Sequence, residues 1–355
     1  MEQPAFSIDT HTPVLVTGAS GYVAGWIVHD LLAAGVTVHG TVRDPDNAAK
    51  TAHLTEMNAR LPGSLKLFKA DLLDAGSFAE AMEGCGIVFH TASPFTVSVD
   101  DPQTGLVDPA LNGTRHVLDQ VNKTPSVDRV VLTSSVVAMY GDMADIAEDH
   151  GGTLTEEAWN TTSSLDHQPY AFSKLLAERE AWRIAEAQDH WKMVVINPSL
   201  VIGPAIGPAP TSESFAIVKA YGDGRTKTGA PRLNFGVVDV RDLARAHLAA
   251  AYLPEATGRH IICGKMTDMA EMGMLLKDRF GADYPIPPRA MPKWLFWLVG
   301  PMLAPITRRY VTRNVGHPIA IDNSKSINAL GQSYRPLKTS IEDMFEQMAE
   351  RGSFG

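Results

Sequence analysis

A glycine-rich turn near the N-terminus constrains the fold of this chain more than any other stretch. Apolar residues 14–16 run directly into Thr17 and Gly18, and an apolar helical pattern begins shortly after Gly21. This order predicts a strand, a tight turn and a helix. Gly18 lets the chain leave the strand sharply, and Gly21 leaves room for a diphosphate at the helix start. The turn predicts a dinucleotide site, with an ordinary strand-to-helix connection as the alternative.

Short strands and helices alternate through the first half of the chain, which is typical of a parallel sheet. We expect further strands at 37–41, 65–69, 87–91 and 129–133, with helices at 50–61, 78–82 and 108–121 between them. Right-handed crossovers bring the carboxyl ends of such strands to one edge, where ligands bind. The predicted fold is therefore a Rossmann-type, doubly wound α/β sheet with a smaller C-terminal substrate-binding lobe.

The predicted domain boundaries follow from changes in this pattern. A loop rich in proline and glycine at 203–210 leaves the sheet edge, and helices are expected at 211–220 and 237–251, with a short strand at 260–263. We expect residues 1–202 and 237–263 to form the dinucleotide-binding domain. Residues 203–236 and 264–355 are expected to form the substrate-binding lobe.

Composition excludes several classes of protein. The net charge of −9 argues against a nucleic-acid surface, and no apolar run is long enough to span a membrane. Cys85 and Cys263 are far apart in sequence, and residues 1–12 lack the pattern of a signal peptide, so we expect a soluble cytoplasmic protein. No histidine spacing predicts a metal site. The expected state is a monomer or a homodimer.

Arg43 indicates which dinucleotide is bound. A site selective for NAD places a carboxylate at the end of the second strand, whereas this chain has Arg43 there, followed by Asp44. A guanidinium group binds a 2′-phosphate through two charge-assisted hydrogen bonds, which favours NADP(H). The alternative is that Arg43 pairs with Asp44 or Asp46. Asp71, beyond the third strand, is expected to bind the adenine amino group or else to cap the next helix.

Tyr170, Lys174 and Ser135 are the candidate catalytic residues. An apolar helical stripe follows Tyr170, so Tyr170 and Lys174 are expected on one helix face, where both reach one ligand. The lysine ammonium is expected to lower the pKa of the phenol, which is otherwise about 10. Ser135 follows the fifth strand and is expected to hold the substrate oxygen by a hydrogen bond.

With these motifs in place, the chain resembles the extended branch of the short-chain dehydrogenase/reductase superfamily. Within that branch it is most similar to the dihydroflavonol 4-reductase and cinnamoyl-CoA reductase group, which has carbonyl reductase relatives. The resemblance covers nearly the whole chain. It rests on the stretches 17–24, 41–44, 71–72, 89–94, 108–114, 132–135, 170–174, 197–204 and 239–242.

The resemblance implies Ser135, Tyr170 and Lys174 as catalytic residues, Arg43 as the 2′-phosphate ligand and Asn112 as a candidate relay residue. It also implies Pro198 beside the nicotinamide. The full expected set of cofactor-binding residues is Thr17, Gly18, Ser20, Gly21, Tyr22, Val23, Arg43, Asp71, Leu72, Thr91, Ala92, Ser93, Tyr170, Lys174 and Pro198.

The predicted activity is reduction of a hydrophobic ketone or aldehyde by NADPH. Cinnamoyl-CoA reductases carry an Asn-Trp-Tyr-Cys-Tyr run where this chain has residues 167–172, so a CoA thioester is not the expected substrate. The alternatives are a hydroxysteroid dehydrogenase, a nucleotide-sugar epimerase or a dinucleotide sensor without catalysis.

A stretch at 286–300 combines proline with large apolar side chains. We expect a helix from Pro292, with Trp294 and Trp297 on one face that packs inward near the substrate pocket. The alternatives are a lid or a membrane-surface patch.

Overall fold

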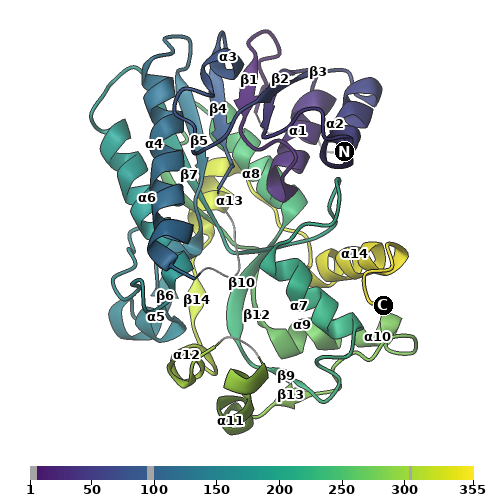
Figure 1. The fold of residues 1–355 in the computed structure, drawn as a ribbon. Helices are drawn as coiled ribbons and strands as arrows, with labels where there is room; N and C mark the ends of the chain where they lie inside the picture. The colour runs from purple at the N-terminus through teal and green to yellow at the C-terminus, as the bar shows by residue number, and fades with distance from the viewer. Residues whose placement is uncertain (1–5, 94–99, 304–305) are drawn as a thin grey trace.

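The computed structural model describes residues 6–93, 100–303 and 306–355 (Figure 1). Residues 1–5, part of the stretch for which no signal peptide is predicted, lie outside the described residues. No helix within the described part of the chain is long and apolar enough to cross a membrane.

A seven-stranded sheet organises the larger part of the molecule. Its order is β3-β2-β1-β4-β5-β7-β11, and every neighbouring pair is parallel. This order reverses beside β1, as in dinucleotide-binding sheets, and confirms the predicted fold class. The strands are β1 (Val14–Val16), β2 (Thr37–Val42), β3 (Ser64–Lys69), β4 (Ile87–His90), β5 (Arg129–Thr133), β7 (Lys192–Pro198) and β11 (Gly258–Ile262).

Helices cover both faces of this sheet (Figure 1). One face carries α1 (Tyr22–Ala33), α2 (Ala48–Arg60) and α8 (Val240–Tyr252), whose apolar side chains share a core with the sheet. The other carries α3 (Ala79–Met82), α4 (Asp108–Asn122) and α6 (Pro169–Ala185). Because both faces are buried, the strands read as nearly continuous apolar runs.

A smaller region is built on a second sheet, β12-β10-β8. Its strands are β8 (Leu200–Ile202), β10 (Asn234–Asp239) and β12 (Lys265–Asp268), and α7 (Glu213–Gly222), α9 (Met269–Leu275) and α14 (Leu337–Glu350) pack around it. The helix expected at 237–251 begins only at Val240. Residues 237–239 instead pair with β8. Two valines followed by an aspartate are too short a run for periodicity to distinguish a strand from a helix.

Short elements complete the chain. They are η1 (Gln103–Val107), η2 (Val136–Ala138), α5 (Met143–Asp149), β6 (Thr153–Leu154), β9 (Ala230–Pro231), α10 (Lys277–Phe280), β13 (Ala290–Met291), α12 (Arg308–Asn314), β14 (Ala320–Ile321) and α13 (Ser324–Leu330). β14 pairs with β6, and α13 packs on α8, so segments after residue 264 also contact the larger region. The domain boundaries stay a prediction.

The helix expected after Pro292 is present as α11 (Lys293–Leu303), but its orientation differs from the prediction. Trp294 is 69% exposed and Trp297 is 40% exposed, whereas Phe296 is half-buried. The expectation that the tryptophan face packs inward is therefore wrong. A three-residue spacing identifies which side chains share a helix face, but not whether that face meets protein or solvent.

Candidate functional site

The glycine turn joins β1 to α1 in a conformation that needs glycine. Gly18 has φ +65°, and a Cβ atom there would lie 3.1 Å from the Cβ of Ala92. Gly21 precedes α1 in an extended conformation, is exposed, and provides no side-chain cap for the first turn of the helix. The backbone N–H groups at the start of α1 are thus available to an anion, which fits the diphosphate of a dinucleotide.

Thr17 fastens this turn to the end of β4. Its buried Oγ1 accepts hydrogen bonds from the backbone N–H groups of Thr91 and Ala92, at 3.1 and 3.0 Å. The hydroxyl of Thr91 donates in return to the Thr17 carbonyl at 2.6 Å. These hydrogen bonds hold the glycine turn against the end of β4, so Thr91 and Ala92 lie next to the turn.

Of Ser20, Tyr22 and Val23 around the start of α1, Tyr22 contacts the smaller region. Ser20 and Val23 are half-buried at the start of α1. The Tyr22 hydroxyl reaches away from the turn and donates to the Gly203 carbonyl at 2.6 Å. Its ring lies edge-on to Phe215 of α7, with centroids 5.3 Å apart. The side chain of Tyr22 thus links α1 to the smaller region.

Arg43 is exposed directly after β2. Within the part of the chain that is described, it makes no ion pair with Asp44 or Asp46, and an Asp44 carboxylate oxygen instead accepts the backbone N–H of Asp46 at 3.1 Å. The guanidinium group is available for a phosphate. Asp71 is also exposed, and its carboxylate accepts the N–H of Leu73 at 2.9 Å in a local turn.

Helix α6 begins at an unusual residue. Gln168 has φ 58°, in the left-handed region that non-glycine residues rarely adopt, and Pro169 occupies the first helical position. The Gln168 amide donates to the Gly141 carbonyl at 3.1 Å and to Asp142 at 3.3 Å. These bonds hold the chain in this conformation and fix the start of the helix, where Tyr170 lies.

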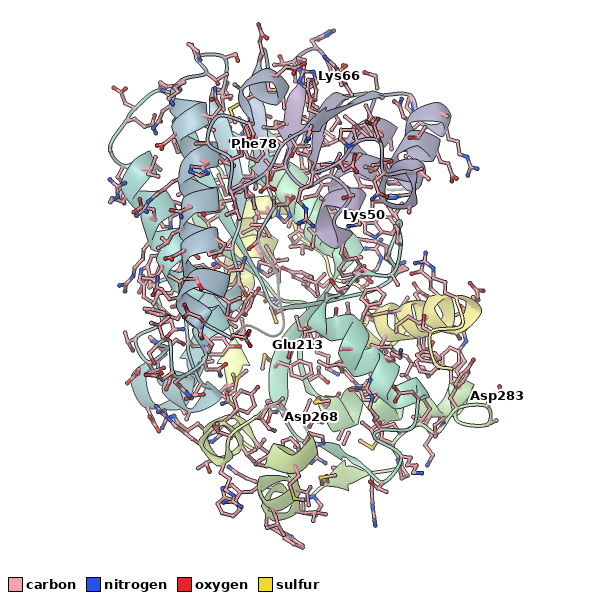
Figure 2. The ribbon with its side chains drawn as sticks, in the orientation of Figure 1. Lys50, Lys66, Phe78, Glu213, Asp268 and Asp283 are labelled. Carbon is pink, nitrogen blue, oxygen red and sulfur yellow. The ribbon has the colours of Figure 1, made fainter. Side chains whose placement is uncertain are left out.

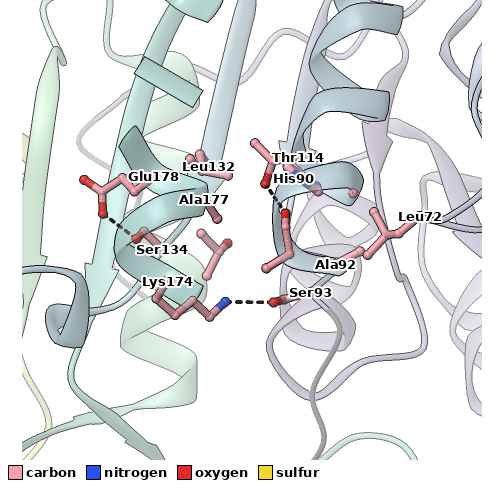
Figure 3. Close-up of a pocket in the computed structure, with 13 residues that line it drawn as sticks. Leu72, His90, Ala92, Ser93, Thr114, Leu132, Ser134, Lys174, Ala177 and Glu178 are labelled. Atoms are coloured by element: carbon pink, nitrogen blue, oxygen red, sulfur yellow. Dashed lines mark hydrogen bonds between the residues drawn. The ribbon is translucent and has the colours of Figure 1, made fainter. Parts of the chain in front are cut away.

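Tyr170 and Lys174 follow one turn apart on α6. The Lys174 Nζ lies 5.8 Å from the centre of the Tyr170 ring and donates to the Ser93 hydroxyl at 2.8 Å (Figure 3). Burial lowers the pKa of Lys174 to about 8, although the Glu178 carboxylate opposes this shift. Burial, assisted by Glu213, raises the pKa of Tyr170 above its ordinary value. In this structure burial, rather than the expected effect of the lysine, dominates the pKa of the phenol.

The side chains of the two serines after β5 have different hydrogen-bond partners, Glu178 for Ser134 and the Val137 N–H for Ser135. Ser134 is buried and donates to the Glu178 carboxylate, whereas Ser135 is half-buried and begins η2, which packs against α6. The Asn197 amide donates to the Ser135 carbonyl at 3.1 Å. Pro198 follows Asn197 at the buried end of β7. Both serines and Pro198 therefore lie at the carboxyl edge of the sheet.

Glu178 is a residue of this region that the sequence reasoning missed. Its buried carboxylate accepts hydrogen bonds from Ser134, from the Asn197 amide at 2.8 Å and from Arg259 Nε at 2.6 Å. It lies one helical turn beyond Lys174, so the i, i+4 spacing that links Tyr170 to Lys174 could have found it. One carboxylate thus connects α6 to the ends of β5 and β7 and to β11.

A small cavity lies between α4 and α6, beside the Lys174 ammonium (Figure 3). Leu72, Ala92, Ser93, Thr114 and Glu178 are among the residues that line it. Asn112 is exposed and does not line this cavity, although its neighbour Gly113 does. The helix therefore turns the candidate relay residue away from the cavity.

Glu213 lies between the two regions, at the start of α7 (Figure 2). Burial raises the pKa of its carboxyl. Burial also raises the pKa values of Tyr140, Tyr170 and Tyr310, and the Glu213 charge adds to each of these shifts. Three phenols from three separate segments therefore share the electrostatic influence of one carboxyl group. Sequence spacing carries no signal for this electrostatic influence, because it arises only in the tertiary fold.

A parallel sheet with this strand order and a glycine turn after its first strand defines a class of dinucleotide-dependent enzymes. The chain belongs to the NAD dependent epimerase/dehydratase family, whose model matches residues 14–264. It is thus an NAD(P)-dependent oxidoreductase of the extended short-chain dehydrogenase/reductase type, which confirms the family resemblance.

Reductases are among the similar proteins. The chain is 36% identical to a cinnamoyl-CoA reductase of Medicago truncatula, with 95% of this chain and 96% of that protein covered. It is 34% identical to tetraketide alpha-pyrone reductase 1 of Arabidopsis thaliana, with 96% of each covered. The structure of yeast methylglyoxal/isovaleraldehyde reductase Gre2 complexed with NADPH superposes with a TM-score of 0.77 and 29% identity, covering 97% of this chain and 100% of that one.

Proposed function

We propose that this protein is an NADPH-dependent carbonyl reductase that acts on a hydrophobic ketone or aldehyde, with Tyr170 as the proton donor. The observation that carries the proposal is the arrangement on α6. Tyr170 keeps its proton because burial raises its pKa, and Lys174 lies one turn away with its ammonium directed at Ser93. A protonated phenol beside a cation is suited to donating a proton to a developing alkoxide.

The residues around the glycine turn fit the cofactor. The positive φ of Gly18, the close approach of Ala92 and the open first turn of α1 form a backbone cradle for a diphosphate. Arg43 is exposed at the end of β2, where a 2′-phosphate is recognised in folds of this kind. The similar yeast reductase was solved with NADPH, which supports the choice of NADPH over NADH.

When bound, the cofactor supplies the hydride for the carbonyl carbon. Ser135 and Tyr170 hold the substrate oxygen by hydrogen bonds, and Tyr170 gives its proton to that oxygen as negative charge develops. Lys174 binds the nicotinamide ribose and stabilises the phenolate that remains. Ser93, which accepts from Lys174, fixes the direction of the ammonium.

The surroundings of Tyr170 favour an uncharged substrate. Burial and the negative charge of Glu213 both raise the pKa of Tyr170, and the same charge would repel a carboxylate next to the substrate carbonyl. The relatives named for reducing cinnamoyl-CoA, a tetraketide pyrone and isovaleraldehyde are consistent with reduction of a carbonyl group on an apolar skeleton.

The test is to follow NADPH oxidation with a panel of substrates. The panel contains aryl ketones, aliphatic aldehydes, flavonoids, cinnamoyl thioesters, sterols and nucleotide sugars, and each ketone is paired with the corresponding 2-keto acid. We expect turnover of neutral apolar carbonyls and little turnover of the acids. Turnover confined to sterols or nucleotide sugars would favour the other enzymes of this fold, and cofactor binding without any turnover would favour a sensor.

A further inference from the structure

Helix α11 presents an apolar face to solvent. Trp294, Trp297, Leu298 and Met302 are 69%, 40%, 51% and 84% exposed. Their spacing of three, four and eight residues from Trp294 places them on one side of the helix. The helix lies at the end of the molecule farthest from β1, next to α12 (Figure 1). Scattered exposed apolar residues are ordinary, but a continuous face with two tryptophans marks an interaction surface.

Exposed cations lie on the helix and on the segments that flank it in sequence. Between Asp283 and Asp322 the sequence contains no acidic residue, although the whole chain has a net charge of −9. Arg289, Lys293, Arg308 and Arg309 are exposed, and none of the four forms an ion pair with any residue that the structure describes. Arg308 lies over the Trp297 ring, 4.6 Å from its centroid. We call the apolar face of α11 and these four cations the α11 surface.

We propose that the α11 surface binds an anionic lipid membrane. An apolar helix face with tryptophan, bordered by lysine and arginine, is the pattern by which helices lie in the interface of a bilayer. The negative net charge of the chain and the positive charge of this surface favour an orientation with the α11 surface toward anionic headgroups. The helix is too short to span the bilayer, so binding is peripheral.

The charge distribution disfavours a second copy of the chain on the same surface. In a two-fold dimer the α11 surface would meet itself, and each cation would approach the same cations of its partner. No acidic residue of the segment is present to compensate them. An anionic bilayer supplies both an apolar acyl-chain region for the tryptophans and negatively charged headgroups for the arginines.

The experiment is sedimentation of the full chain with vesicles of phosphatidylcholine alone or of phosphatidylcholine with phosphatidylserine. We expect binding to the anionic vesicles only, and release as salt is added. Arg308→Gln with Arg309→Gln should weaken partitioning about 30-fold, from about 1 kcal/mol for each cation near the surface. Trp294→Ser with Trp297→Ser should weaken it about tenfold or more.

Matched variants away from the surface provide the controls. Arg60→Gln with Lys123→Gln removes two exposed cations from the larger region, and Ile327→Ser removes an exposed apolar side chain of α13. Both should bind vesicles like the unmodified protein. The proposal is overturned if the unmodified protein does not sediment with anionic vesicles, or if the tryptophan variant binds as well as the controls. It is also overturned if size-exclusion chromatography shows a dimer that the tryptophan variant abolishes, with no vesicle binding.

Discussion

Arg259 and Glu178 form a buried ion pair, with 2.6 Å between Arg259 Nε and Glu178 Oε1. The same carboxylate lies one turn from Lys174 and raises the pKa of that lysine against the opposing effect of burial. The ion pair therefore contributes to the electrostatic environment of the Lys174 ammonium. We expect Glu178 to position and tune Lys174 without contacting the substrate.

The pH dependence of kcat/KM tests this role. Because the pKa of Lys174 is about 8, kcat/KM should fall as the pH rises through about 8 and the ammonium loses its proton. Glu178→Gln removes the negative charge that stabilises the ammonium, so the fall should begin at lower pH. The midpoint is read from the profile and does not depend on how much of the variant folds.

Glu180→Gln is the matched control for this profile. Glu180 lies two residues further along α6 and pairs with Arg115 and Arg183 at the surface. Its loss removes the same formal charge from the same helix without touching Lys174. If both variants shift the midpoint equally, the effect belongs to the net charge and not to the Glu178 position.

Tyr170→Phe tests the proton donor. The substitution keeps the ring and removes the hydroxyl, so we expect kcat to fall by a factor of about 100 or more while NADPH binding is retained. Lys174→Ala should weaken both turnover and NADPH binding, because one ammonium serves the phenol and the ribose. Fluorescence titration with NADPH separates the two variants. Near-normal turnover by Tyr170→Phe would disprove the proposed mechanism.

Arg43→Ala tests the choice of cofactor. The affinity of the variant for NADPH should fall about tenfold, and its affinity for NADH should be nearly unchanged. A loss of about tenfold is at the low end for a charge-assisted hydrogen bond, because Arg43 is exposed to solvent. Arg60→Ala at the end of α2 removes an exposed arginine without a predicted phosphate contact. Equal losses of affinity for NADPH and NADH would show that Arg43 does not recognise the 2′-phosphate.

Gly18 and Gly25 offer a paired test of the glycine turn. Gly18→Ala forces an alanine to φ +65° and against Ala92, which should cost about 1 to 3 kcal/mol in the free energy of unfolding. Gly25 lies inside α1, and a Cβ there meets nothing within 4 Å. Gly25→Ala should leave stability unchanged or raise it by up to about 1 kcal/mol. Urea denaturation compares them, and an equal loss in both would contradict the geometric argument.

The sequence predicted those parts of the fold that depend on local patterns. The strands of the larger sheet are short apolar runs between turn residues, and their carboxyl edge follows from parallel connections alone. The second sheet was missed because residues 234–239 form a strand only by pairing with β8 and β12. The orientation of α11 was predicted wrongly because apolar spacing does not distinguish a covered face from an exposed one.

The candidate site shows the same limit. Tyr170 and Lys174 could be found because one helix carries both at a fixed spacing. Glu213 could not, since it lies on α7, far from Tyr170 in sequence, and its charge affects the pKa of Tyr170 only in the folded chain. The direction of the Tyr170 pKa was also beyond the sequence, because burial is a property of the folded chain.

Helix α1 is anchored at two points on the segment that leads into the smaller region. The Tyr22 hydroxyl donates to the Gly203 carbonyl at 2.6 Å, and the Trp26 indole donates to the Pro204 carbonyl at 2.8 Å. The helix whose first turn is proposed to receive the cofactor is thus fastened to the segment that leads into the proposed substrate-binding region. Occupancy of one site is therefore expected to alter affinity at the other, and thermodynamic linkage requires the two effects to be equal. Trp26→Phe, which removes the indole donor to Pro204 at a residue outside the predicted cofactor and catalytic sets, should reduce both effects by the same factor.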